Sequence, residues 1–167
     1  MKKILFVLIP IISFTACKGH KITKKCCDSP PIQENFTGGY LSMPNIFSPD
    51  GDGINDVLVI RHKGLKSFYL TIKNGIGKKI FETTDPDQFW GGSHKNKIDY
   101  GSYKYKLEVE TINGEKINTE GRICVWGFNG CKSCNCIEDA DKCVFGDRLD
   151  TSAILNPSSD QPDLKCN

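Results

Sequence analysis

The sequence predicts an all-β fold, an immunoglobulin-like antiparallel β-sandwich of about six to eight strands. We expect a signal peptide before it and a loop-rich, disulfide-containing C-terminal tail after it. Short segments rich in β-branched and aromatic residues alternate with turn residues, and none of them shows the longer period of an amphipathic helix. The expected strands comprise residues 56–62, 67–73, 78–83, 102–111 and 115–126.

Two of these segments alternate apolar and polar side chains, which is typical of a strand with one buried face. In residues 67–73, Phe68, Leu70 and Ile72 occupy every second position. In residues 102–111 the predicted buried face consists of Tyr103, Tyr105, Leu107 and Val109, and the opposite face carries Lys104, Lys106 and Glu108.

A hairpin is predicted at the end of the second alternating segment. Asn113 and Gly114 form the dipeptide that most strongly favours a tight turn between antiparallel strands. Residues 115–126 would then be the returning strand, and Gly121 is a candidate β-bulge within it.

The N-terminus has the pattern of an export signal. Two lysines precede an apolar run at residues 4–12, which is far shorter than the roughly 20 residues of a membrane-spanning helix. A small residue directly before Cys17 resembles a bacterial lipobox, so we expect residues 1–16 to be a lipoprotein signal peptide and Cys17 to be acylated. Residues 17–40 would form a flexible tether to the membrane. The alternative is an ordinary signal peptide with a coincidental cysteine.

The charge balance argues against nucleic acid as a partner. The chain has 22 Lys and Arg residues against 20 Asp and Glu residues, and two of the lysines belong to the expected signal peptide. A nucleic-acid-binding protein usually shows a basic excess. The sequence also lacks the nucleophile-elbow, metalloprotease and phosphate-loop motifs, so we expect a protein without enzymatic activity.

Nine cysteines indicate an oxidising compartment or a metal site. If Cys17 carries lipid, an even number remains for disulfides. Residues 127–167 would be a cysteine-rich tail stapled by these bonds. The disulfide candidates are Cys26, Cys27, Cys124, Cys131, Cys134, Cys136, Cys143 and Cys166.

The cysteine pattern leaves its pairing open. The adjacent Cys26 and Cys27 must have different partners, because two neighbouring residues cannot both reach the same sulfur. An alternative function is a metal-binding or redox protein that uses the closely spaced Cys131, Cys134, Cys136 and Cys143.

One acidic loop offers oxygen ligands for a hard cation. Asp50, Asp52, Asn55 and Asp56 lie within seven residues and alternate with glycine, a pattern that suits Ca²⁺. The same residue types are favoured in a turn without any metal, so both interpretations stay open. Calcium is the one cofactor that the sequence suggests.

From Met43 onward the sequence resembles the gliding-motility-associated C-terminal domain, the type B sorting domain of Bacteroidota type IX secretion. The segments that carry the resemblance are Pro44–Asp56 (PNIFSPDGDGIND), Phe68–Glu82, Trp90-Gly91 and Tyr100–Trp126. The resemblance implies an immunoglobulin-like sandwich at residues 41–126. It also implies partners in the outer-membrane, gliding or type IX secretion machinery.

The family usually places this domain at the end of a chain, behind a large cargo. Here 41 residues follow Trp126, and the expected lipobox lies about 25 residues upstream of the domain. We therefore expect an outer-membrane lipoprotein, with the cell surface as one possible location, whose sandwich acts in sorting or protein interaction. A purely structural role is a further alternative.

Overall fold

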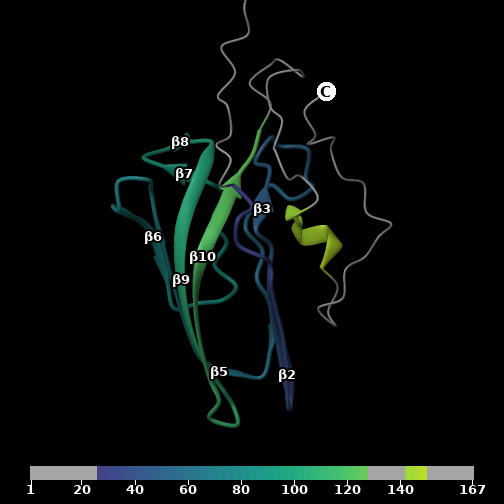
Figure 1. Cartoon of the computed structure of the whole chain (residues 1–167). Helices are drawn as coiled ribbons and strands as arrows, with labels where there is room; N and C mark the ends of the chain where they lie inside the picture. Colours follow the sequence, from purple (N-terminus) through teal and green to yellow (C-terminus); the bar gives the residue numbers. More distant parts are fainter. Residues whose placement is uncertain (1–25, 128–141, 150–167) are drawn as a thin grey trace, which may run out of the picture.

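The computed structural model describes residues 26–127 and 142–149 (Figure 1). The expected signal peptide and Cys17 lie outside the described residues, as do Cys131, Cys134, Cys136 and Cys166. Within the two described ranges, no helix has the length and apolar character needed to span a membrane.

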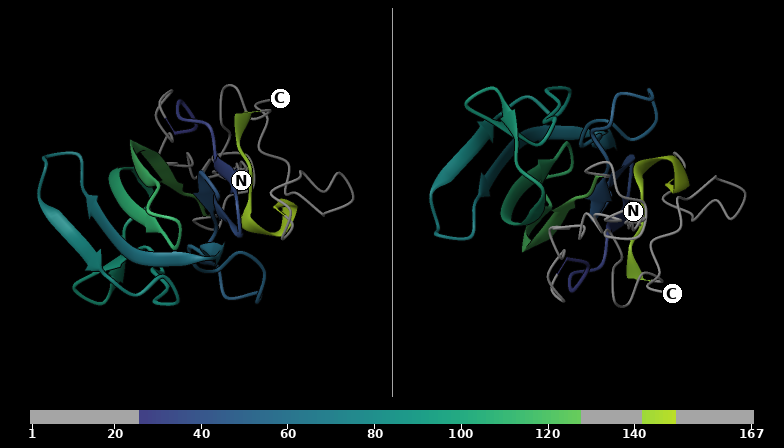
Figure 2. Two further views of the ribbon diagram at one scale, coloured as in Figure 1. Left: turned by 90° about the horizontal axis from the view of Figure 1, so that it is seen from below. Right: turned by 90° about the horizontal axis from the view of Figure 1, so that it is seen from above.

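The described residues form a sandwich of two main sheets and a small hairpin, which confirms the predicted all-β class (Figures 1 and 2). The smaller main sheet has the order β1-β2-β4, and the larger has the order β3-β10-β9-β5-β6. The short strands β7 and β8 pair with each other. The strands are β1 (Ile32–Phe36), β2 (Gly39–Met43), β3 (Ile46–Phe47), β4 (Arg61–Lys63), β5 (Leu65–Lys73), β6 (Lys79–Thr83), β7 (Ser93–His94), β8 (Lys97–Ile98), β9 (Gly101–Thr111) and β10 (Lys116–Val125).

The alternating segments became the centre of the larger sheet. The predicted inward residues of β5 and β9 are all buried, because alternation places every second side chain on the face toward the other sheet. The predicted hairpin joins β9 to β10, and its turn closes when the Gly114 amide donates to the Thr111 carbonyl at 2.9 Å.

The predicted bulge at Gly121 is wrong. The β9–β10 register runs without a shift through this position, where Gly121 is opposite Tyr105. A Cβ atom on residue 121 would lie 2.8 Å from the Ser29 hydroxyl oxygen and 2.9 Å from the Tyr105 ring. Glycine is needed here because another segment approaches the strand closely, rather than because the strand bends.

The segment predicted as a strand at residues 56–62 pairs much less than expected. Only its end belongs to β4, and Leu58 makes a single bridge to Trp90. The side chains of Leu58 and Ile60 are nevertheless buried, so the alternating pattern predicted their burial correctly but not their pairing. Among the residues that the structure describes, no neighbouring strand runs alongside this part of the chain, and an extended backbone without a partner is not a ladder strand.

One strand pair departs from the predicted antiparallel arrangement. β3 pairs with β10 in parallel, with Ile46 opposite Cys124 and Phe47 opposite Val125. β3 follows β2 after two residues, and the chain passes from the smaller sheet to the larger one without reversing direction. A strand that changes sheets in this way keeps its direction and so lies parallel to β10.

Residues 26–40 are part of the fold, so the predicted tether of residues 17–40 is wrong over this range. Strand β1 and the start of β2 form a hairpin here, in register from Ile32 with Met43 to Phe36 with Gly39. Ile32 is buried in the core. The proline and glycine pairs on each side of this segment suggested a spacer, but they bound a short edge strand instead.

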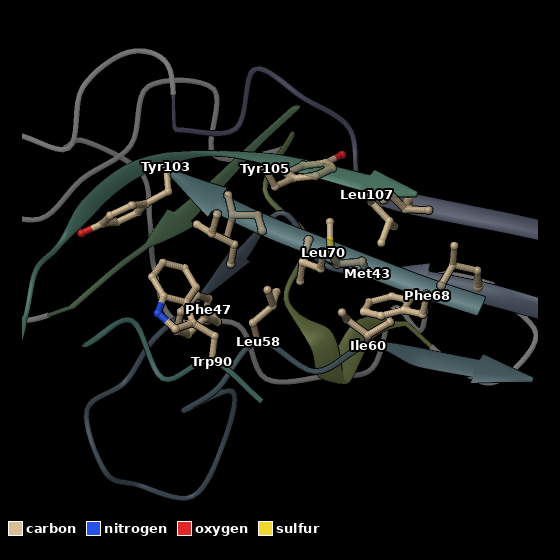
Figure 3. Packing of buried hydrophobic residues seen from close by; sticks show 14 of the residues in the cluster. Met43, Phe47, Leu58, Ile60, Phe68, Leu70, Trp90, Tyr103, Tyr105 and Leu107 are labelled. Carbon is tan, nitrogen blue, oxygen red and sulfur yellow. The ribbon is translucent and has the colours of Figure 1, made fainter. Parts of the chain in front are cut away.

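Trp90 lies in the main core between the sheets, next to Phe47 and Tyr103 (Figure 3). Its side chain is 3% exposed and packs edge-on against Phe47 and Tyr103, with ring centroids 5.5 and 5.1 Å away. Aromatic pairs prefer this edge-to-face geometry over a stacked one. Since Phe47 and Tyr103 come from different strands, Trp90 helps to fix their relative positions.

We expect Trp90→Ala to lower the free energy of unfolding by about 3–5 kcal/mol, because it leaves a large cavity among rings that cannot close together. Chemical denaturation would measure this loss. Phe89→Ala is the matched control: Phe89 is the sequence neighbour but is 52% exposed, and its removal should change stability by no more than about 0.5 kcal/mol. Equal losses for both variants would contradict the assignment of Trp90 to the core.

Candidate functional site

The acidic loop at residues 48–56 is closed by its own backbone. The Ser48 amide donates to the Asn55 carbonyl at 2.8 Å, which brings the two ends of the loop together. Within the loop, the Asp56 carboxylate accepts the Gly51 amide at 2.7 Å and the Gly53 amide at 2.9 Å. Asp52 accepts the Ile54 amide at 2.7 Å. The loop is therefore shaped by carboxylates that bind its amides, as in Asx turns.

This arrangement gathers the three predicted aspartates. Carboxylate oxygens of Asp50, Asp52 and Asp56 all lie within 4.8 Å of one another. Partial burial raises the pKa of Asp50, and the neighbouring Asp52 and Asp56 carboxylates raise it further. The amides of Gly51 and Gly53 lower the pKa of Asp56, which keeps this carboxylate charged.

Asn55, the fourth predicted ligand, is bound to the end of the described chain. Its side-chain oxygen accepts the Asp147 amide at 3.0 Å, and its amide nitrogen donates to the Asp147 carboxylate at 3.0 Å. The residue adopts a positive φ of 55°, which asparagine tolerates better than most side chains. Asn55 thus links the acidic loop to residues 142–149, a contact that sequence reasoning did not anticipate.

Residues 142–149, here called the C-terminal segment, dock on the sandwich through Asn45. Asn45 is 1% exposed, and its side-chain oxygen accepts the Val144 amide at 2.7 Å. Its side-chain nitrogen donates to the carbonyls of Lys142 and Ser29, each at 2.8 Å. One buried amide group therefore satisfies backbone groups from two segments that are far apart in the sequence.

Two disulfides join the N-terminal residues 26–27 to β10 and to the C-terminal segment. Cys26 bonds to Cys124 with 5.0 Å between the Cα atoms, and Cys27 bonds to Cys143 with 5.3 Å. The adjacent cysteines have different partners, as expected. Because the Cys143 sulfur is bonded to Cys27, it is not available as a thiolate for the alternative four-cysteine metal or redox site.

A second, smaller core forms around the disulfides. Trp126, directly after β10, packs edge-on against Phe145 of the C-terminal segment, with ring centroids 6.5 Å apart. Ile46 of β3 completes the cluster with the four bonded cysteines. Asn45 and Phe145 belong to no periodic pattern in the sequence. The sequence alone therefore could not predict this second core.

A family model described as the CHU_C type IX secretion signal domain matches residues 41–125. The chain belongs to this family. The matched residues begin in β2 and end at the last residue of β10. The domain match therefore covers the sandwich except β1, and it excludes Cys26, Cys27 and the C-terminal segment that pack against it.

The solved structure of CopC from Methylosinus trichosporium OB3b is similar to this chain. The two share 13% sequence identity with a TM-score of 0.40, and the alignment covers 60% of this chain and 98% of CopC. A search of curated protein sequences found no match.

We expect Asn45→Ala to destabilise the domain by about 2–4 kcal/mol, because the buried Val144 amide and two carbonyls lose their partner. Thermal or chemical unfolding under non-reducing conditions would measure the loss, and the disulfides should keep the variant folded. Asn118→Ala is the control, since Asn118 is exposed on β10. A variant at residue 45 as stable as this control would show that Asn45 does not hold the C-terminal segment.

Proposed function

We propose that this protein is a non-enzymatic outer-membrane lipoprotein, anchored by lipid at Cys17, whose sandwich acts as a sorting or protein-interaction module. The observation that supports the proposal is the family match, which spans nearly the whole sandwich. A type IX secretion signal domain associates a protein with that secretion system in general. The proposal further includes the lipid anchor, the outer-membrane location and a direct partner in the gliding or secretion machinery.

The module would meet its partner as a folded unit larger than the matched domain. Cys26 and Cys27 tie the N-terminal side to β10 and to the C-terminal segment, respectively. The acidic loop also contacts this segment through Asn55 and Asp147. A receptor that binds this end of the sandwich would therefore contact the added segments together with the family domain.

The sorting role predicts that surface exposure depends on type IX secretion. An epitope placed after Asn167 should be accessible to antibody on intact cells, and accessibility should be lost in cells that lack a working secretion system. The Cys17→Ser variant should fail to incorporate labelled fatty acid and should be released from membranes. Exposure that persists without the secretion system would contradict the sorting role, and lipid incorporation by Cys17→Ser would contradict the anchor at this residue.

We further propose that the acidic loop binds Ca²⁺ as a structural ion. The specific support is the close approach of the Asp50, Asp52 and Asp56 carboxylates, since a hard cation favours several oxygen ligands. Partial burial raises the Asp50 pKa most, and repulsion from Asp52 and Asp56 adds to it. This repulsion would be replaced by attraction once a divalent cation lies between the carboxylates.

Millimolar Ca²⁺ should therefore raise the melting temperature by about 4–8 °C over the same protein in chelator. Asp52→Asn should remove most of this rise, because it deletes one charged ligand without changing the size of the side chain. Asp28→Asn, at an exposed position away from the loop, should keep the full rise. An identical melting temperature with Ca²⁺ and with chelator would exclude the site.

A further inference from the structure

The larger sheet carries a row of positive charges across four neighbouring strands. The registers place Lys79 of β6 opposite Lys73 of β5, Lys73 opposite Lys104 of β9, and Lys104 opposite Arg122 of β10. We call these four residues the cationic row. Residues directly opposite each other on adjacent strands share a face of the sheet, so all four project on the same side.

This side is the outer face of the sandwich. Lys73, Lys79 and Lys104 are exposed, whereas the residues that precede Lys73 and Lys104 in their strands are buried in the core. Like charges placed directly opposite each other destabilise a sheet. The cationic row therefore does not stabilise the fold. Binding of an anion at this face would explain why the row is there.

The rest of the outer face is electrically balanced. Lys66 pairs with Glu110 and Lys106 pairs with Glu108, with nitrogen–oxygen distances of 2.5 Å. Within the cationic row, Lys79 pairs with Glu82. In the described part of the chain, no carboxylate lies within ion-pair distance of Lys73, Lys104 or Arg122. On the outer face of the larger sheet, the positive charge in excess is thus concentrated at one end. The acidic loop follows β3 at the same end of the domain, because β3 runs parallel to β10, but it is not part of this face.

A hollow adjoins the row at the β10 edge. Lys104 and Arg122 line a space of about 300 Å³ together with Ser29, Tyr105, Gly121 and the exposed Glu120. Glu120 is opposite Lys106, two residues along the strands from the Arg122–Lys104 pair. A phosphate-sized group could therefore approach both cations from solvent.

An exposed isoleucine projects from the same end of the sheet. Ile76 lies in the turn between β5 and β6, directly after Lys73, and 87% of its surface is exposed. The turn is rigid: the Asn74 amide donates to the Lys78 carbonyl at 2.9 Å, and the Gly77 amide donates to the Asn74 carbonyl at 2.9 Å. Lys78, also exposed, adds another cation beside it. A fixed apolar tip between lysines suits the interface of a bilayer, where acyl chains adjoin charged headgroups.

The chain enters the domain at this end as well. β10 ends at the top of Figure 1, and Cys26, the first described residue, is bonded to Cys124, two residues beyond Arg122. Cys17 precedes Cys26 by nine residues, which span at most about 30 Å. The sequence between them contains Lys18, Lys21, Lys24 and Lys25. A lipid on Cys17 would hold the cationic row close to the membrane.

We propose that the end of the sandwich formed by the cationic row and Ile76 docks on an anionic membrane surface. Lys73, Lys104 and Arg122 contact phosphate-bearing headgroups, and Ile76 enters the boundary between headgroups and acyl chains. The orientation of the domain rests on the proposed lipid anchor, whereas the binding itself does not. A soluble acidic protein would match the charges, but it would give no reason for an exposed apolar tip on a rigid turn.

Vesicle binding by the chain from residue 17 onward, without the expected signal peptide and with Cys17→Ser so that it cannot be acylated, tests the proposal. Cosedimentation should show tight binding to vesicles with about 30% phosphatidylglycerol, weaker binding to pure phosphatidylcholine, and loss of the difference at high salt. Changing Lys73, Lys104 and Arg122 together to Gln should weaken binding to the anionic vesicles about 100-fold, or about five-fold for each cation. Ile76→Ser should weaken it about ten-fold.

The matched controls lie at the opposite end of the domain. Changing Lys63, Lys66 and Lys116 to Gln removes the same charge, and Ile112→Ser removes an isoleucine that is 58% exposed. Both control variants should bind like the parent, and all variants should melt within a few degrees of it.

Equal losses from the control triple would overturn docking through the cationic row. If the protein binds soluble poly-glutamate as tightly as vesicles, and Ile76→Ser does not weaken that binding, the partner would be an acidic protein rather than a membrane. Neither result depends on surface sorting by type IX secretion.

Discussion

Two adjacent cysteines with different partners impose the constraint on which the described architecture depends. Cys26 is bonded to Cys124 across 98 residues, and Cys27 is bonded to Cys143 across 116 residues. In the chain-entropy model, closing a loop of this size restricts the unfolded chain and stabilises the folded state by about 4–5 kcal/mol. The second bond adds about 3 kcal/mol, because with the first in place it closes only about 20 further residues. Two consecutive residues, Cys26 and Cys27, therefore hold both β10 and the C-terminal segment that follows it.

The disulfides also decide what the domain contains. Without them, the matched domain would be a two-sheet sandwich around Trp90. With them, a second core of Trp126 and Phe145 lies at one end of the sandwich, and the buried amide of Asn45 satisfies the backbone beside it. A short segment with too few apolar residues for its own core gains one by packing on the sandwich.

The two ends of the sandwich consequently differ in chemistry. The chain enters the end that carries the cationic row and the exposed Ile76 on the larger sheet, and the acidic loop directly after β3. The opposite end carries the Asn113-Gly114 turn and the β1–β2 turn, which are joined by a hydrogen bond from the Asn113 side chain to the Thr37 carbonyl. An anchored domain with such polarity would present one end to the membrane and the other to solvent.

Residue patterns alone determined the all-β class, the inward faces of β5 and β9 and the hairpin at Gly114, because alternation and turn preference are local properties. The segments that resemble the sorting family, and hence the family itself, were also evident in the sequence. Only the tertiary structure decided which cysteines pair, why Gly121 must be glycine, and that residues 32–36 form a strand rather than a tether. It likewise assembled the cationic row, whose members are dispersed over residues 73–122. These features depend on strand register and on contacts between distant segments, and no local sequence pattern encodes them.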